Sequence, residues 1–142
     1  YTLKTVAEFR GFQKLAATED FHGIKIKLGT DVDLNPGWTA GATAPEVVWT
    51  PIGRDAKDTS VIKAFRGTFD GQGHTIKNVN ITTGEAAGLF IASKAIKIMN
   101  LKLDDVHVTG SLVGNSTAGI LASDCNGGID NITITNSSVF FI

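Results

Sequence analysis

One six-residue pattern occurs three times in the sequence: Ile76-Lys77-Asn78-Val79-Asn80-Ile81, Ile98-Met99-Asn100-Leu101-Lys102-Leu103 and Ile129-Asp130-Asn131-Ile132-Thr133-Ile134. Each copy reads Ile-x-Asn-apolar-x-apolar, and the copies follow one another after 22 and then 31 residues. Alternating apolar residues are typical of a β-strand, and a pattern that returns at this spacing predicts short strands stacked one on another. The sequence therefore predicts an all-β fold, a right-handed parallel β-helix, whose functional residues lie on its outer faces.

The shared asparagines of this pattern are Asn78, Asn100 and Asn131. Asparagine suits turns, and stacked side-chain amides can hydrogen-bond to one another along a stack of strands. We therefore expect Asn78, Asn100 and Asn131 to form a structural ladder.

The N-terminal segment carries a helix signal. Thr5-Val6-Ala7-Glu8 has the spacing of a capping box, and Val6, Phe9, Phe12 and Leu15 recur every three residues. We expect a helix from about Val6 to Ala17 whose Phe9, Phe12 and Leu15 cover the first turn of the β-helix. Residues 1–23 then form an N-terminal capping helix and residues 24–142 the rungs, which we expect to continue into further domains of the same chain.

The segment 35–46 is rich in Gly, Ala, Pro and Thr and has no periodicity, which predicts an extruded loop that carries Trp38. Trp49 lies in the regular part of the chain, where we expect it to be packed. A tryptophan in a non-repeating loop can stack on a sugar or on a partner protein, although a contact that anchors the loop is the simpler interpretation. Trp38 is the one candidate ligand-binding residue.

The composition of the chain limits the classes of partner that it is expected to bind. Thirteen basic and fourteen acidic residues among 142 give a net charge of −1, which argues against nucleic acid as a partner. No stretch approaches 18 apolar residues, so we expect no membrane insertion. Cys125 is the single cysteine, expected as a small core residue, and the sequence predicts neither a cofactor nor a metal site.

Several phrases in this order resemble a known family: Trp49-Thr50-Pro51-Ile52-Gly53, the segment 65–76 with its Asp70-Gly71-Gln72-Gly73-His74 core, and Gly88-Leu89-Phe90. The chain resembles the GLUG-repeat β-helix domains of bacterial secreted and cell-surface proteins, such as adhesin-like proteins and the N-terminal regions of immunoglobulin A1 proteases. The resemblance covers about residues 24–139, and Phe90 is followed by Ile91 where family repeats often have glycine. It implies an extracellular or bacterial cell-surface location and a role in adhesion, and it names no catalytic residues.

Two short motifs contain the residue types of a catalytic site and of a calcium site. Asp70-Gly71-Gln72-Gly73-His74 offers an Asp and a His, yet its glycines are typical of a tight turn and no second carboxylate lies at a reactive spacing. Asp31-x-Asp33-x-Asn35 resembles the start of a calcium loop, but Pro36 and Ala42 stand where such a loop needs Gly and Glu. We interpret Asp104-Asp105 as a solvated corner, and His22 and His107 as surface residues.

These observations favour a module that is not an enzyme: a scaffold or spacer with adhesin-like character, which binds a glycan or a host surface protein as its candidate partners. One alternative is a carbohydrate-active β-helix, a polysaccharide lyase or glycoside hydrolase, which would need clustered carboxylates and basic residues in one groove. Another is an accessory domain of a secreted protease.

Overall fold

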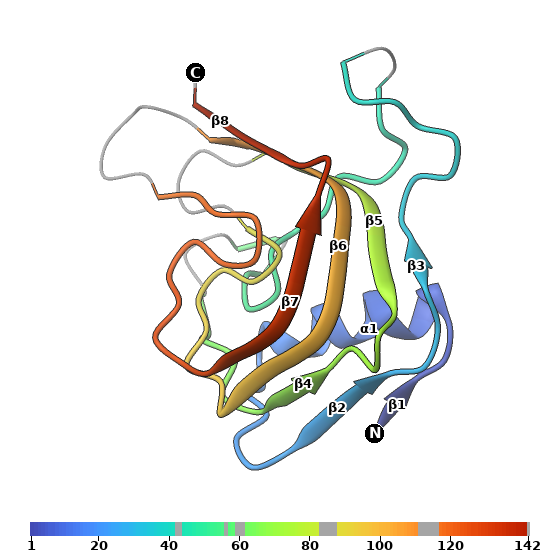
Figure 1. The fold of residues 1–142 in the computed structure, drawn as a ribbon. Coiled ribbons are helices and arrows are strands. Elements are labelled where there is room, and N and C mark those ends of the chain that lie inside the picture. The colour runs from blue at the N-terminus through green and yellow to red at the C-terminus, as the bar shows by residue number, and fades with distance from the viewer. Residues whose placement is uncertain (42–43, 56, 59–61, 83–87, 111–116, 142) are drawn as a thin grey trace.

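The structure is a computed structural model that describes residues 1–41, 44–55, 57–58, 62–82, 88–110 and 117–141. Most of its regular structure is β-strand, with one short helix near the N-terminus (Figure 1). The elements follow the chain in this order: β1 (Thr2–Leu3), α1 (Val6–Ala16), β2 (Lys25–Leu28), β3 (Val32–Asp33), β4 (Thr68–Asp70), β5 (Thr75–Thr82), β6 (Lys97–Gly110), β7 (Ile129–Thr135) and β8 (Ser138–Phe141).

All pairs of named strands are parallel, and each strand lies beside a strand from an earlier or later pass of the chain. One series runs β1-β2-β4-β6-β7, and its register joins Ile26 to Phe69, Phe69 to Ile98 and Ile98 to Ile129. A second series runs from β3 to β5, β6 and β7, and a third joins the end of β5 to β6 and β8. This parallel arrangement is compatible with the predicted β-helix.

Strand β6 takes part in all three series because it bends twice. The bends lie at Asn100 and Asp105, which adopt the left-handed backbone conformation with φ of 54° and 53°. Asparagine and aspartate reach this conformation at lower cost than other residues with a side chain, because their short polar groups hydrogen-bond locally. The bends turn the sheet around a core in which Phe69, Ile98 and Leu103 are fully buried.

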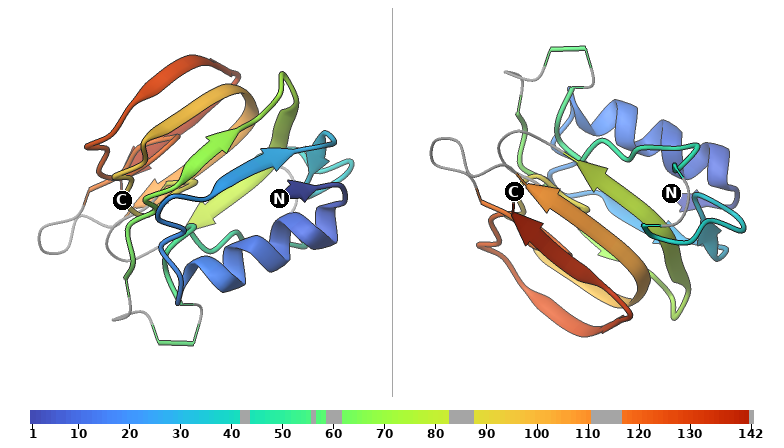
Figure 2. Two further views of the ribbon diagram at one scale, coloured as in Figure 1. Left: turned by 90° about the horizontal axis from the view of Figure 1, so that it is seen from below. Right: turned by 90° about the horizontal axis from the view of Figure 1, so that it is seen from above.

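Helix α1 lies across the end of the stack beside β1 and β2, opposite β7 (Figure 2). It begins at Val6, as expected, and Thr5 Oγ1 accepts a hydrogen bond from Glu8 N at 3.1 Å. The Glu8 carboxylate accepts from Lys4 N at 2.9 Å, one residue before the amide that the capping-box motif predicts. The helix ends at Ala16 rather than Ala17.

The buried face of α1 differs in one residue from the expected stripe. Phe9 and Phe12 are buried as predicted, and the Phe9 ring stacks on Trp49 with centroids 5.0 Å apart and planes within 9°. Leu15 is 58% exposed, so its predicted place in the interface was wrong. Gln13 lies there instead and donates to Arg54 O at 3.2 Å, because positions 9, 12, 13 and 16 share one helix face.

Burial follows the strand pattern through most of the core, but apolar residues of the last pass of the chain, among them Ile129, Ile134 and Val139, are exposed. Trp49 is 3% exposed and donates through Nε1 to Leu89 O at 3.2 Å, which confirms the prediction that it is packed. Cys125 is exposed, so the expectation of a core cysteine was wrong. It pairs with Ser93 by an isolated bridge in the same late pass of the chain as β7, whose residues are mostly exposed.

Candidate functional site

The first bend of the sheet holds a ladder of polar side chains. Asn100 Nδ2 donates to Asp70 Oδ1 at 3.2 Å, and Asn131 Nδ2 donates to Asn100 Oδ1 at 3.0 Å. Asn131 has the same left-handed backbone as Asn100, with φ of 54°. The structure therefore brings together two of the three predicted ladder asparagines, with Asp70 beneath them.

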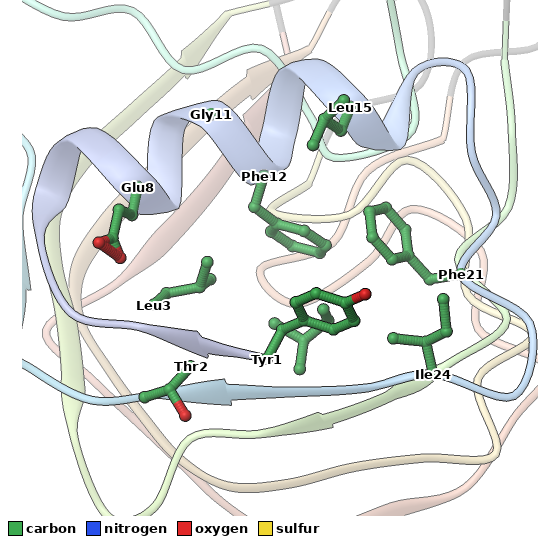
Figure 3. Close-up of a pocket in the computed structure, with 10 residues that line it drawn as sticks. Tyr1, Thr2, Leu3, Glu8, Gly11, Phe12, Leu15, Phe21 and Ile24 are labelled. Atoms are coloured by element: carbon green, nitrogen blue, oxygen red, sulfur yellow. The ribbon is translucent and has the colours of Figure 1, made fainter.

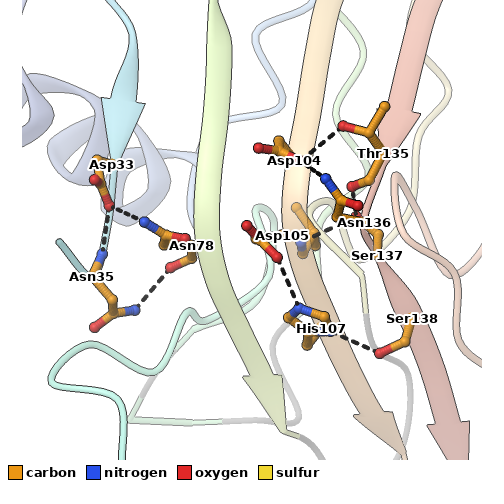
Figure 4. Close-up of polar contacts among 11 residues, drawn as sticks. Asp33, Asn35, Asn78, Asp104, Asp105, His107, Thr135, Asn136, Ser137 and Ser138 are labelled. Atoms are coloured by element: carbon orange, nitrogen blue, oxygen red, sulfur yellow. Dashed lines mark hydrogen bonds and ion pairs between the residues drawn. The ribbon is translucent and has the colours of Figure 1, made fainter. Parts of the chain in front are cut away.

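Asn78 lies at the second bend and not in this ladder. Its Nδ2 donates to Asp33 Oδ1 at 2.8 Å, while the register of β5 and β6 places it beside Asp105 (Figure 4). Asn78, Asp105 and Asn136 all have positive φ, at 57°, 53° and 48°. The Ile-x-Asn pattern occurs at both bends because each bend requires a residue in the left-handed backbone conformation.

The second bend carries a carboxylate with several partners. Asp104 accepts from Thr135 Oγ1 at 2.8 Å and from Asn136 Nδ2 at 2.9 Å (Figure 4). These hydrogen bonds from Asn136 and Thr135 hold the pKa of Asp104 below its ordinary value. The Asp104-Asp105 pair therefore belongs to a hydrogen-bonded corner of the fold.

Asp70 and His74 bond to different partners. Asp70 Oδ1 accepts from Gln72 N at 2.9 Å, and Lys25 Nζ lies 3.7 Å from Asp70 Oδ2. Burial raises the pKa of Asp70, but hydrogen bonds from Gln72 and Asn100 and the charge of Lys25 outweigh it and lower the pKa overall. Gln72 has φ of 52° and Gly73 has φ of 79°, as a turn requires.

His74 instead contacts Asp31. His74 Nδ1 lies 3.1 Å from Asp31 Oδ1, which also accepts from Thr75 N at 2.9 Å. These hydrogen bonds, that of Thr75 first, hold the pKa of Asp31 below its ordinary value. The fold therefore brings the Asp31 carboxylate and the His74 imidazole together on the surface.

The calcium-like segment uses its oxygens within the protein. Asp33 Oδ1 accepts from Asn35 N and Asn78 Nδ2, and Asn35 Oδ1 accepts from Val47 N at 2.7 Å. Asn35 is 1% exposed and ties the start of the 35–46 loop to the sheet. Among the described residues, no three His, Cys, Asp or Glu side chains gather as a metal site would require.

Trp38 lies half-buried against the outer face of the sheet. Its ring meets the His107 ring edge to face, with centroids 5.9 Å apart. His107 Nδ1 lies 2.8 Å from Ser138 Oγ, and His107 Nε2 lies 3.5 Å from Asp105 Oδ1 (Figure 4). Trp38 also lines a hollow of about 210 Å³ with Asn35, Gly37 and Glu46.

These contacts correct the interpretation of His107. It is a half-buried residue that joins the Trp38 loop to β6 and β8, whereas His22 is exposed as expected. Nothing in the spacing of Trp38 and His107, which are 69 residues apart, marks them as neighbours. The candidate site is therefore Trp38 with the adjacent polar groups of Asp105, His107 and Ser138.

Comparison with known proteins gives one informative likeness. The chain is 30% identical over 141 residues to halomucin of the archaeon Haloquadratum walsbyi. The aligned region is 96% of this chain and about 1% of the length of halomucin. No family model matches the sequence, and no solved structure matches it.

The halomucin likeness is compatible with a surface or secreted module. Halomucin is an archaeal protein, whereas the family resemblance in the sequence predicts a bacterial protein. In the described part of the chain, no helix has the length and apolar character to cross a membrane.

Proposed function

We propose that this chain is a segment of a right-handed parallel β-helix of the GLUG-repeat type and serves as a non-catalytic module of a cell-surface or secreted protein. The observation that carries the proposal is the continuous parallel register from β1 through β2, β4 and β6 to β7. Each pass of the chain adds a strand to the same series, so further passes lengthen a stiff rod. Such a rod holds a binding surface at a fixed distance from an anchoring point.

The binding surface of this proposal is the outer face around Trp38. An indole ring offers a flat apolar face to a sugar, and neighbouring polar side chains can hydrogen-bond to its hydroxyl groups. Asp105 is 48% exposed beside His107, and Ser138 is exposed on the next strand. The ligand class is a glycan, carried by a polysaccharide or by a surface protein.

The alternative of a carbohydrate-active enzyme has in its favour two contacts between a carboxylate and an imidazole, Asp31 with His74 at 3.1 Å and Asp105 with His107 at 3.5 Å. A carboxylate beside an imidazole is a combination that acid–base catalysis uses. Asp31 is 69% exposed, however, and lies on an open outer face. Glycoside hydrolysis usually requires two carboxyl groups that flank the bond to be cleaved.

A glycan and protein array tests the proposal, with the unmodified chain compared with Trp38→Ala and with Ile96→Ala. Ile96 is a suitable control because it is 63% exposed and apolar but lies before β6, away from the Trp38 loop. We expect binding that Trp38→Ala abolishes and Ile96→Ala retains, with unchanged melting of both variants. Absence of binding, or binding that Trp38→Ala leaves intact, contradicts the proposed site.

A turnover assay tests the non-catalytic part separately. Neutral and acidic polysaccharides are incubated with the chain, and released reducing ends and unsaturated products are measured. We expect no product. Release of product that disappears in His74→Ala or Asp31→Asn would support the enzymatic alternative instead.

A further inference from the structure

The segment that leads into β7 contains the only Asn-Gly pair of the sequence, Asn126-Gly127 (Figure 1). Both residues are exposed. In such a pair the backbone nitrogen of glycine can attack the side-chain carbonyl carbon of asparagine, because glycine has no Cβ to hinder the approach. The reaction requires that the glycine N–H and the asparagine side chain are not held by hydrogen bonds, so their partners decide whether the pair is reactive.

The backbone on both sides of the pair is fixed to the preceding pass of the chain. Asn126 N donates to Ser93 O at 2.8 Å, and Gly128 N donates to Ala95 O at 3.3 Å. The Gly127 N–H lies between these two bonds. In the part of the chain that the structure describes, neither this N–H nor the side-chain amide of Asn126 has a hydrogen-bond partner.

The open N–H of Gly127 does not result from its place in the last pass. The bridge between Ser93 and Cys125 sets the two passes side by side, so Ala95 is the equivalent of Gly127 in the preceding pass. Ala95 N donates to Ser93 Oγ at 3.2 Å, an acceptor in its own pass rather than in the pass beside it. Cys125 replaces this serine in the last pass, and its sulfur is a weak acceptor.

The exposure of Asn126 also has a counterpart inside the stack. Lys94 occupies the equivalent position of the preceding pass, and it is exposed although residues 124–128 lie beside it. The packing in turn requires glycine at position 127, because a Cβ atom there would overlap Ala95 O and lie 2.8 Å from Ala95 N. The fold therefore keeps a glycine after an exposed asparagine.

The fold blocks the same reaction at two comparable pairs. At Asp70-Gly71, the glycine N–H donates to Met99 O at 2.8 Å. At Asn136-Ser137, the asparagine amide donates to Asp104 Oδ1 at 2.9 Å. These pairs serve as internal controls for Asn126-Gly127.

We propose that Asn126-Gly127 is a site of spontaneous deamidation in the folded protein. Gly127 N attacks Asn126 Cγ, the bond between Cγ and Nδ2 breaks, and ammonia leaves with the proton of Gly127 N. Water then adds to one of the two carbonyl groups of the succinimide ring and opens it to an aspartate or an isoaspartate. The isoaspartate carries one extra carbon in the backbone between the hydrogen bonds to Ser93 and Ala95, so it loosens the last pass. This inference does not depend on the proposed glycan binding.

The test incubates the whole chain at mildly alkaline pH, folded and in urea, with a reducing agent that protects Cys125. Peptide mapping by mass spectrometry follows conversion at Asn126 and Asn136, and labelling by an isoaspartyl methyltransferase identifies isoaspartate. We expect folding to slow Asn126 by less than threefold and Asn136 by at least tenfold. Absence of conversion at Asn126, slowing of Asn126 by more than threefold, or equal slowing of the two sites would overturn the proposal.

Two variants of Cys125 test the reason for the open N–H. Cys125→Ser offers Gly127 N the acceptor that Ser93 offers Ala95 N, so it should slow conversion at least threefold, whereas Cys125→Ala should react within twofold of the unmodified chain. Circular dichroism verifies that each variant is folded. An unchanged rate in Cys125→Ser would refute this explanation of the open N–H.

A third variant tests the effect of the extra backbone carbon. Asn126→Asp adds the negative charge without that carbon, so the isoaspartate form of the chain should unfold at a lower urea concentration than Asn126→Asp. Equal urea midpoints would contradict the loosening of the last pass.

Discussion

Replacement of Phe9 by alanine removes the ring that joins α1 to the end of the stack. Phe9 is fully buried, stacks on Trp49 at 5.0 Å and lies 6.5 Å from the Phe12 ring. Phenylalanine-to-alanine changes in a core cost about 3–5 kcal/mol, of which about 0.5–1.5 kcal/mol comes from the aromatic pair. With a urea m value of about 2 kcal/mol/M, the unfolding midpoint should fall by roughly 2 M.

The assay is urea unfolding followed by both tryptophan fluorescence and circular dichroism. Leu15→Ala is the matched control because Leu15 lies on the same helix but is 58% exposed, so its cost should stay below about 1 kcal/mol. Phe9→Leu keeps most of the volume and should cost about 1–2 kcal/mol. A loss in Leu15→Ala equal to that in Phe9→Ala, or a loss below 1 kcal/mol in Phe9→Ala, would refute the described packing of α1.

Three further predictions concern the bends. Gly71→Ala should lower the free energy of unfolding in urea by about 1–3 kcal/mol, because the Cβ of the alanine would lie 2.5 Å from Asn100 O and 2.9 Å from Leu101 Cα. An unchanged free energy of unfolding would contradict this close approach. Asn100→Ala should destabilise the fold more than Asn100→Gly. Both variants lose the hydrogen bonds to Asp70 and Asn131, but glycine adopts the positive φ at position 100 at lower cost than alanine. A greater loss of stability in Asn100→Gly would argue against the left-handed bend. The pKa of Asp70 is lowered in the folded chain, so its ionised carboxylate should stabilise the fold fully above about pH 5, and this stabilisation should be lost as the pH falls below about 4 through the folded pKa. The measurement is the difference in unfolding free energy between the unmodified chain and Asp70→Asn at each pH. A difference that grows on acidification would contradict the lowered pKa.

The sequence predicted the strands and the helix well because their burial is periodic. Val6 to Ala16 and the strands at residues 25–28 and 75–82 lie where the apolar residues indicated. The assignment of Leu15 to the interface failed because two apolar faces adjoin on α1: one packs on the stack and the other lines a hollow beside β1 (Figure 3). Hydrophobic spacing alone does not separate such faces.

The register was harder to predict than the strands. Asn78 and Asn100 share a pattern yet lie at different bends, since the chain turns left-handed at both bends, at Asn100 and Asp105 in β6 and at Asn131 and Asn136 in the next pass. The true partner of Ile76-Lys77-Asn78-Val79-Asn80-Ile81 is Leu103-Asp104-Asp105-Val106-His107-Val108, which has Asp where the pattern has Asn. Because aspartate also tolerates the left-handed region, a pattern that allowed either residue would have found this pairing.

The candidate site was only partly predictable. The irregular composition of the 35–46 segment singled out Trp38, but its contact with His107 depends on how the loop folds back over β6. Asn35, which holds the loop through Val47 and Asn78, was interpreted only as a calcium-loop mimic. Long-range contacts of this kind arise from tertiary packing, which leaves no local pattern.

Disulfide trapping of adjacent strands tests the stacked parallel register most directly. In a Cys125→Ser background, the pair Lys102→Cys and Thr133→Cys joins residues that the register places side by side, at a spacing of about 5 Å that a disulfide can bridge. The pair Lys102→Cys and Thr135→Cys is shifted by two residues, to about 7–8 Å. We predict rapid, nearly complete oxidation of the first pair in the folded chain and little of the second; equal trapping of both pairs, or preference for the shifted pair, would contradict the stacked register.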